Sequence, residues 1–322
     1  MSKWTINDIP DQTGRVFIIT GANSGLGYES TLALARKNAR IVMACRNMEK
    51  GEVAAEAVRQ QVPQADLDLM QLDLASLDSI HNFAAAFQAR YARLDVLMNN
   101  AGVMAIPRRE TTDGFEMQFG VNHLGHFALT GRLLPLLLRT PGSRVVTVSS
   151  MVHLVGRIYF DDLRVRNNYS RYCAYGQSKL ANVLFAFELQ RRLAAVGNDT
   201  ISVAAHPGYA ATELQSTSTT TSNATLEGLS YKIGNNLMAQ SAATGAVSQL
   251  RAAVDPGVQG GEFWGPRFTA FGQARPGRAQ KNAYDPDIAS RLWQRSEELT
   301  GVRFEFAQST DDVTVAAGKQ TP

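Results

Sequence analysis

Cysteines, excess charge and long apolar runs are all scarce in this sequence. Its 322 residues include two cysteines, Cys45 and Cys173, too few for an extracellular disulfide framework, so we expect a reducing, cytoplasmic location. The formal net charge is only +3 and no run of Lys or Arg is long, which argues against nucleic-acid or membrane-surface partners. The apolar stretch at 133–138 is too short to span a bilayer, and the opening residues lack the apolar core of a signal peptide.

The strongest local pattern is the segment Arg15–Gly27, RVFIITGANSGLG. An apolar, β-branched run ends in three closely spaced glycines, and a helical pattern follows over Leu26–Arg36. This arrangement is typical of a dinucleotide pyrophosphate site: Gly21 allows a sharp turn, Gly25 a close approach to the phosphates, and Gly27 close packing of helix on sheet. Free N–H groups at the helix N-terminus then attract the anion. A glycine-rich turn often only connects two elements and binds no ligand, so the interpretation depends on the strand before it and the helix after it.

Strand-like and helix-like segments alternate along the rest of the chain. Further strands are predicted over Arg40–Ala44, Leu67–Leu72, Leu94–Met98, Arg144–Val148 and Ile201–Ala205. Further helices are predicted over Met48–Val62, from a cap at Ser76 to Tyr91, and over Phe115–Leu138 and Tyr175–Ala195. The alternation predicts a single doubly wound α/β domain of the Rossmann type, with about seven parallel strands and helices on both faces. No linker interrupts it, so one domain is expected over residues 14–306.

Three segments depart from this regular pattern. Residues 1–13 are expected to be a loose lead-in, and residues 307–322 a weakly ordered tail. The segment 215–225, QSTSTTTSNAT, has the composition of a mobile loop. A disordered surface insertion and an active-site lid fit this composition equally well, and residues 215–240 are interpreted as a mobile substrate-loop region.

Ligands of such sheets bind at the carboxyl ends of the strands, and Cys45-Arg46 follows the second strand. NAD enzymes commonly place an acidic side chain here for the ribose hydroxyls, whereas Arg46 can bind a 2′-phosphate. A strand-end arginine is often merely solvated, but beside the glycine turn it favours NADP(H) over NAD(H). Asp73 follows the third strand, where its carboxylate can accept from an adenine amino group or cap the next helix.

A second chemical signal is Tyr175-Gly176-Gln177-Ser178-Lys179. Tyr and Lys four residues apart share one face of a helix. The ammonium group favours the phenolate and lowers the phenol pKa from its usual value near 10, which makes Tyr175 a candidate acid for protonating a carbonyl oxygen. The pair alone also occurs by chance on exposed helices.

The order of the motifs resembles that of the short-chain dehydrogenase/reductase family. In sequence order they are Thr20-Gly21…Gly25-Leu26-Gly27, Asp73, Asn99-Asn100-Ala101-Gly102, Asn122, Ser149-Ser150, Tyr175 with Lys179, and Pro207-Gly208 with Thr212. The resemblance extends from about residue 14 to residue 300. Several motifs, among them Ala44-Cys45-Arg46-Asn47 and NHLGHF, are similar to the retinol dehydrogenase and protochlorophyllide reductase-like branch.

The resemblance implies four catalytic positions. Tyr175 would be the acid in reduction and the base in oxidation, and Lys179 would lower its pKa and bind the nicotinamide ribose. Ser150, with Ser149 as its rival, would polarise the substrate oxygen. Asn122 would hold a water that links Lys179 to solvent, and an asparagine in mid-helix indicates a local distortion there.

The resemblance also implies a cofactor-binding set and a substrate pocket. The cofactor set is Gly21, Asn23, Ser24, Gly25, Leu26, Gly27, Arg46, Asp73, Leu74, Asn100, Ala101, Gly102, Tyr175, Lys179, Pro207, Gly208 and Thr212. The expected pocket wall is Ser150, Met151, His153, Leu154, Tyr209 and Leu214, any of which could instead be core. No metal is expected, because the five histidines lack ligand spacing; His123 and His126 are interpreted as packing or surface groups.

Together these features predict an NADP(H)-dependent oxidoreductase that interconverts an alcohol and a ketone or aldehyde. The mostly apolar pocket wall favours a lipophilic small-molecule substrate, although fold and family name no substrate. The alternatives are a nucleotide-sugar epimerase or dehydratase, which usually has a longer C-terminal domain, and a non-catalytic NADP(H)-sensing regulator, which typically loses the Tyr or Lys. The resemblance also implies a homodimer formed through the helices at 115–138 and 175–195.

Overall fold

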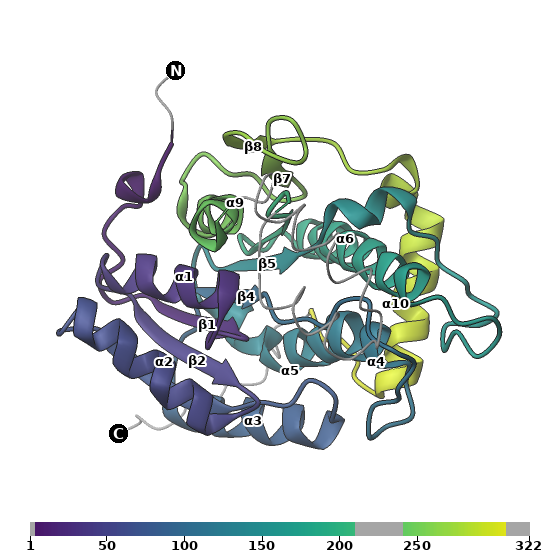
Figure 1. Cartoon of the computed structure of the whole chain (residues 1–322), viewed down its shortest axis with the longest axis horizontal. Helices are drawn as coiled ribbons and strands as arrows, with labels where there is room; N and C mark the ends of the chain where they lie inside the picture. The colour runs from purple at the N-terminus through teal and green to yellow at the C-terminus, as the bar shows by residue number, and fades with distance from the viewer. Residues whose placement is uncertain (1–3, 210–240, 307–322) are drawn as a thin grey trace, which may run out of the picture.

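The computed structural model describes residues 4–209 and 241–306 of the chain. One sheet of eight strands runs through it in the order β3-β2-β1-β4-β5-β6-β7-β8 (Figure 1). The strands are β1 Val16–Thr20, β2 Arg40–Cys45, β3 Asp66–Gln71, β4 Val96–Asn99, β5 Arg144–Val148, β6 Ile201–Ala205, β7 Phe263–Pro266 and β8 Ala274–Pro276. All neighbours are parallel except β7 and β8, which pair antiparallel. The doubly wound α/β prediction is confirmed, with an antiparallel edge strand in addition.

Helices cover both faces of the sheet. The helical elements are η1 Ile6–Asp8, α1 Gly25–Ala35, α2 Met48–Gln61, α3 Leu77–Arg90, α4 Met117–Phe119, η2 Gly120–Leu124, α5 Gly125–Arg139, η3 Met151–Val155, α6 Arg171–Ala195, α9 Ala242–Val254, η4 Lys281–Tyr284 and α10 Pro286–Thr300. Helices α1, α2 and α9 share one core cluster with the sheet, and α3, α5 and α6 pack in the clusters of the opposite face. None of the described helices is both long and apolar enough to cross a membrane.

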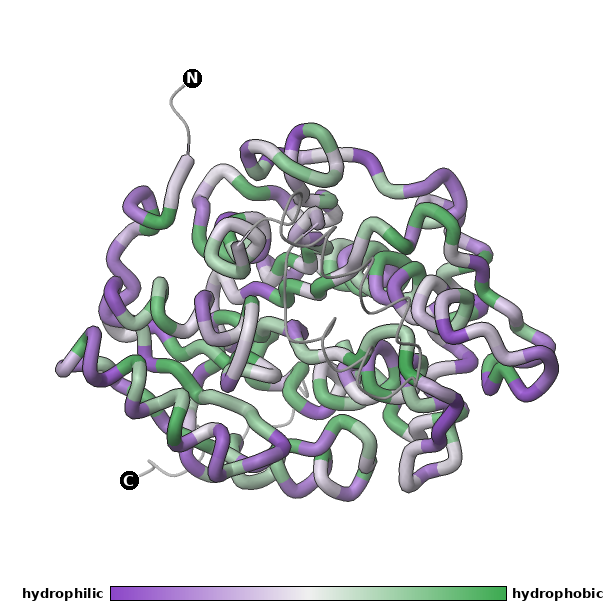
Figure 2. The backbone as a smooth tube through the Cα atoms, in the orientation of Figure 1, coloured by the Kyte–Doolittle hydropathy of each residue, from purple (hydrophilic) through white to green (hydrophobic). Residues whose placement is uncertain are grey.

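The core lies between the sheet and these two helical layers. Along β1, Phe17 and Ile19 belong to the cluster beneath α1, while Val16 and Ile18 belong to the cluster beneath α3 and α5. Every residue of β1 is buried, as expected for a parallel strand covered on both faces. Figure 2 shows many of the hydrophilic residues on the outer loops and hydrophobic segments toward the middle of the molecule.

Helix α10 closes the α6 face with an aromatic cluster. Trp293 of α10 packs 4.4 Å from the ring of Phe304 and 5.1 Å from the ring of Phe127 of α5, measured between ring centroids. Phe185 of α6 stacks on the same Trp293 ring at 5.8 Å. This intramolecular packing uses apolar surface of the two helices to which the expected homodimer was assigned, and the oligomeric state stays a prediction.

The predicted elements and the observed ones differ mainly in the second half of the chain. Ser76 caps α3, with its hydroxyl accepting from the Ser79 N–H, as predicted. The helix predicted over 115–138 is confirmed as a continuous helical stretch over 117–139, in which a π-helical turn, η2, joins α4 to α5. Elements α9, β7, β8 and α10 were not predicted. The lead-in is anchored more than expected, since Ile9 is buried in the core beneath α1.

Candidate active site

A cleft of about 280 Å³ opens at the carboxyl ends of β1, β2, β3 and β4. This position is the point where the strand order reverses, between β1 and β4, and ligands of doubly wound sheets bind there. The predicted cofactor residues that line it are Gly21, Asn23, Ser24, Gly25, Leu26, Arg46, Asp73, Leu74, Asn100, Ala101 and Gly102. Thr20, Ala44, Leu72, Val103, Met104, Ile106 and Val121 also line it.

The glycine turn between β1 and α1 has the geometry expected of an anion cradle. Gly21 and Gly25 adopt left-handed φ angles of +66° and +52°, which a side chain would strain. A Cβ on Gly27 would overlap the carbonyl oxygen of Gly21, so only glycine lets α1 approach the turn this closely. Ser24 stands at the N-cap of α1, and its hydroxyl makes no capping hydrogen bond. The Ser24 side chain therefore leaves the first N–H groups of α1 available to an anion in the cleft.

The end of β2 presents a cation and no carboxylate to the cleft. Arg46 is exposed, lines the cleft and joins no ion pair within the described ranges. Its neighbour Cys45 is buried, and burial raises the thiol pKa to about 11, so this cysteine is an inert packing group. Asn47 caps α2 by accepting from the Lys50 N–H, which leaves Arg46 as the charged group at this strand end.

Asp73 lines the cleft after β3 and also organises the local turn. Its Oδ1 accepts from the Ala75 N–H at 2.9 Å, and its own N–H donates to Ser79 Oγ at 2.9 Å. The cap of α3 is Ser76, so the alternative that Asp73 caps this helix is wrong. The carboxylate is fixed at the cleft wall by the turn.

A buried hydrogen-bond relay joins the glycine turn to the opposite wall of the cleft. Thr20 Oγ1, at the end of β1, accepts from the N–H groups of Asn100 and Ala101, each at 2.9 Å. The same oxygen lies 2.9 Å from His126 Nε2, and His126 Nδ1 lies 3.0 Å from the carbonyl oxygen of Asn122. A carbonyl only accepts, so Nδ1 carries the proton and Nε2 accepts from Thr20. Burial lowers the pKa of His126 to about 4, which keeps the ring neutral.

His126 was interpreted only as a packing or surface group, and its relay was missed. Both His123 and His126 are buried; His123 Nε2 lies 2.9 Å from Ser296 Oγ of α10. The spacing of four residues between Asn122 and His126 is the signal that could have been used, since residues four apart face each other on a helix.

Asn122 lies in the π-helical turn η2, which confirms the predicted distortion. Its side chain clamps the segment after Gly102: Oδ1 accepts from the Val103 N–H at 2.8 Å, and Nδ2 donates to the Val103 carbonyl at 2.9 Å. Nδ2 also donates to Ser178 Oγ at 2.9 Å, and Ser178 in turn donates to the Tyr175 carbonyl. Asn122 therefore fixes η2 against α6. The water attributed to it stays a prediction.

Tyr175 and Lys179 lie one turn apart on α6 and are both buried. Lys179 Nζ lies 5.8 Å from the centroid of the Tyr175 ring and donates to the Val148 carbonyl at 3.1 Å. Burial lowers the lysine pKa from 10.5 to about 8. A Cβ on Gly102 would lie 3.5 Å from this Nζ, so the ammonium group lies next to Gly102 of the cleft wall, although neither Tyr175 nor Lys179 is among the described residues that line the cleft itself.

The two serines after β5 have different surroundings. Ser149 is buried, and its hydroxyl donates to the Lys179 carbonyl at 2.7 Å. Ser150 is partly exposed at the N-cap of η3, where its Oγ accepts weakly from the Val152 N–H at 3.3 Å. Val152 packs on Gly176, the neighbour of Tyr175, so η3 holds Ser150 at the Tyr175 end of α6.

The remaining predicted residues lie around β6 and η3. Gly208 adopts φ +73°, and a Cβ there would clash with the Ala270 carbonyl. His153 is buried, and its Nδ1 donates to the Ser150 carbonyl at 2.6 Å. Met151, Pro207 and Tyr209 are partly buried, and Leu154 is exposed. Thr212, Leu214 and the segment 215–240 lie outside the described residues.

Three comparisons place these features in a family. The family model for short chain dehydrogenases matches residues 15–223. Retinol dehydrogenase 13 of Homo sapiens is 42% identical over 297 residues, covering 90% of this chain and 85% of that protein. Retinol dehydrogenase 12 of Mus musculus is 40% identical over 294 residues, covering 91% of this chain and 88% of that protein.

A solved structure agrees with the fold. It is that of an uncharacterised protein from Mycobacterium paratuberculosis, with a TM-score of 0.78 and 42% identity, covering 94% of this chain and 100% of that one. The motifs, the fold and the relatives all agree, and the chain belongs to the short-chain dehydrogenase family as an oxidoreductase related to the retinol dehydrogenases.

Proposed function

We propose that the protein interconverts a lipophilic ketone or aldehyde and its alcohol with NADP(H), using Tyr175 as the acid in reduction and the base in oxidation. The observation that carries the proposal is the buried Tyr175–Lys179 pair, whose ammonium group lies next to Gly102 of the cleft that begins with the glycine turn. Ser150 and Asn122 lie on the elements that flank this pair.

The residues that line the cleft suit the pyrophosphate, the 2′-phosphate and the adenine of NADP(H). The start of α1, which the Ser24 side chain does not cap, supplies N–H donors for a pyrophosphate. The left-handed Gly21 and Gly25 shape the turn before it, and the Gly21 N–H itself donates to the Ala44 carbonyl at 2.9 Å. Arg46 supplies a guanidinium for a 2′-phosphate where an NAD enzyme would place a carboxylate. Asp73 and Leu74 form the wall that would face the adenine. These features favour NADP(H) over NAD(H).

Lys179 is suited to activate Tyr175. With a pKa of about 8, about ten in eleven of these side chains carry a proton at pH 7. The ammonium group lies on the tyrosine side of α6 in a buried setting, where its charge favours the phenolate of Tyr175 more strongly than in water. The proton that Tyr175 gives to a carbonyl oxygen is then readily released and recovered.

The other residues orient the reactants. Within the described residues the Ser150 hydroxyl only accepts a weak hydrogen bond from the Val152 N–H, so it can donate to a substrate oxygen, whereas the Ser149 hydroxyl donates to the Lys179 carbonyl. Asn122 holds Val103 and Ser178 and so fixes the distance between the cleft and α6. When bound, the nicotinamide supplies or accepts the hydride.

A lipophilic substrate is supported by two observations. The relatives are named for retinol, a long apolar alcohol, and they match about 90% of this chain. The elements beside Ser150 carry the apolar side chains Met151, Leu154 and Val155, of which Leu154 and Val155 are exposed. Apolar groups next to a proton donor suit a carbonyl on an apolar chain.

The proposal is tested by oxidation of NADPH and NADH in the presence of a panel of hydrophobic aldehydes and ketones, with Tyr175→Phe as the blank. We expect turnover with NADPH, slower turnover with NADH, and none in the variant. Faster turnover with NADH would overturn the role of Arg46. NADPH binding without turnover of any panel member would favour the sensing regulator instead.

A further inference from the structure

A second cavity, of about 170 Å³, lies between η3, the end of β6 and the β7–β8 edge of the sheet. Its lining includes His153, His206 and three arginines, Arg267, Arg275 and Arg278, and none of the described residues that line it carries a carboxylate. Among the described residues that line it, none belongs to the predicted cofactor set or to the Tyr175–Lys179 pair. Its chemistry is that of a site rich in hydrogen-bond donors.

The charge of the three arginines is not neutralised within the described residues. None of the ion pairs found there includes Arg267, Arg275 or Arg278. The guanidinium of Arg275 donates to the Arg267 carbonyl at 3.3 Å, and that of Arg267 lies over the Phe268 ring at 5.4 Å. Both contacts hold the side chains near the β7–β8 turn and leave their charge in place.

His206 adds a buried donor on the same wall. It is only 4% exposed, and the Gly208 N–H donates to its Nδ1 at 3.3 Å, which places the ring proton on Nε2. Burial and the neighbouring His153 lower the pKa of His206 to about 3, so the ring is neutral. Nε2 lies where a Cβ of residue 265 would stand, a position open only because that residue is glycine. The only hydrogen bond of the ring within 4–209 and 241–306 is the one at Nδ1, so the Nε2–H group is available to a ligand.

The cavity is also tied to the candidate active site. His153, which lines it, donates from Nδ1 to the Ser150 carbonyl at 2.6 Å. His206 is followed directly by Pro207 and Gly208, which belong to the cofactor set that the resemblance implies. The cavity therefore adjoins η3, the turn whose N-cap is Ser150.

We infer that the cavity binds an oxyanion, a carboxylate or phosphate group, and that this anion is the acidic end of the carbonyl substrate. Three guanidinium groups and the His206 N–H donor, which meet no carboxylate among the described residues, are complementary to such a group. The inference rests on the proposed function and narrows its substrate to a lipophilic carbonyl compound that carries an acid. A free anion from solution has the same chemistry, and the experiment separates the two sources.

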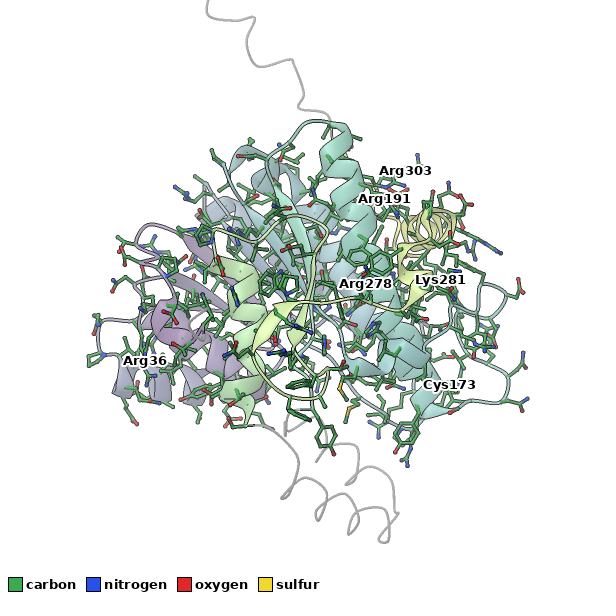
Figure 3. All side chains as sticks on the ribbon, turned by 90° about the horizontal axis from the view of Figure 1, so that it is seen from above. Arg36, Cys173, Arg191, Arg278, Lys281 and Arg303 are labelled. Atoms are coloured by element: carbon green, nitrogen blue, oxygen red, sulfur yellow. The ribbon has the colours of Figure 1, made fainter. Side chains whose placement is uncertain are left out.

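The first arm compares decanal with 10-oxodecanoate, two aldehydes that differ in one terminal carboxylate, as substrates with NADPH. We expect wild type to have the higher kcat/KM for the oxo acid. Arg278→Gln should lower kcat/KM for the oxo acid about fivefold, because one exposed guanidinium–carboxylate pair is removed. Its kcat/KM for decanal should stay within about twofold of the wild-type value. Arg303→Gln is the matched control: Arg303 is also exposed and lies well away from Arg278 (Figure 3). The Arg303→Gln substitution should leave kcat/KM unchanged for both substrates.

The second arm titrates inorganic phosphate into wild type and Arg278→Gln by calorimetry, with NADP⁺ saturating so that the Arg46 end is filled. Phosphate binding to wild type that weakens in the variant, without any preference for the oxo acid, would confirm the anion site and assign it to a free anion. Equal kcat/KM for both aldehydes, together with no difference in phosphate binding, overturns the inference. If neither aldehyde is turned over, the proposed function fails and the phosphate titration still decides the anion site.

Discussion

Lys179→Met should inactivate the enzyme and at the same time stabilise its fold. Lys179 is 4% exposed and no carboxylate pairs with its ammonium group within the described residues. Burial lowers its pKa from 10.5 to about 8, which shows that the folded state holds the charge at a cost. A buried charge maintained for chemistry is a typical source of conflict between stability and activity.

The size of the effect follows from proton linkage. The decrease from 10.5 to about 8 corresponds to roughly 3 kcal/mol of destabilisation at pH 7. Between pH 8 and 10.5 the unfolded chain binds the proton and the folded chain does not, so the free energy of unfolding of wild type rises with pH in this window. Methionine loses the hydrogen bond to the Val148 carbonyl, but Asn182 Nδ2 still donates to that oxygen at 3.0 Å.

The assay is urea denaturation of wild type and Lys179→Met at pH 7 and pH 10.5. At pH 7 the variant should have the larger free energy of unfolding, by roughly 3 kcal/mol, and the difference should nearly vanish at pH 10.5. Lys281→Met, at an exposed lysine (Figure 3), is the control and should change stability by less than about 0.5 kcal/mol at either pH. A variant that is less stable than wild type at pH 7, or a difference independent of pH, would refute the reasoning.

Four further substitutions test the other walls of the site. Arg46→Asp should raise KM for NADPH at least about tenfold and lower KM for NADH, measured by steady-state kinetics with one carbonyl substrate; unchanged cofactor preference contradicts the 2′-phosphate role. Ser150→Ala should lower kcat about a hundredfold with little change in Tm, whereas Ser149→Ala should cost about 1 kcal/mol of stability with kcat within a few-fold; the opposite pattern would make Ser149 the catalytic serine. His126→Leu should cost about 1–3 kcal/mol in urea denaturation and raise KM for NADPH, because the Thr20 hydroxyl and the Asn122 carbonyl lose their shared partner; an unchanged KM would show that the relay only stabilises.

The first two thirds of the fold could be predicted because its signals are local. Buried parallel strands are short apolar runs between turn residues, and Arg144–Val148 and Ile201–Ala205 begin and end where the sequence predicts. The later strands lack this pattern: β7 is Phe-Trp-Gly-Pro and β8 is Ala-Arg-Pro, and glycine and proline usually indicate turns. The π-helical turn within the helix predicted over 115–138 has a signal in Gly120 and Gly125, which weaken the helix on both sides of Asn122.

The candidate site also has features that the sequence predicts from one short segment and features that depend on residues far apart in the chain. The glycine turn, Arg46 and the Tyr175–Lys179 pair each lie within one short segment, so the sequence places them directly. The contact between Thr20 and His126 joins residues 106 positions apart, and no local pattern contains it. The basic cavity beside His206 likewise depends on β7 and β8 returning to the end of β6. The difference between Ser149 and Ser150 depends on which hydroxyl meets α6, which only packing determines.

The most direct test of the account is the comparison of wild type and Tyr175→Phe in two measurements on the same preparation: the dissociation constant for NADPH and the kcat for reduction of an aldehyde. Phenylalanine keeps the ring on the buried face of α6 and removes only the group that gives the proton. The account predicts that kcat falls at least about a thousandfold while the NADPH dissociation constant changes by less than about threefold. A kcat within tenfold of wild type would contradict it, because another group would then be the acid.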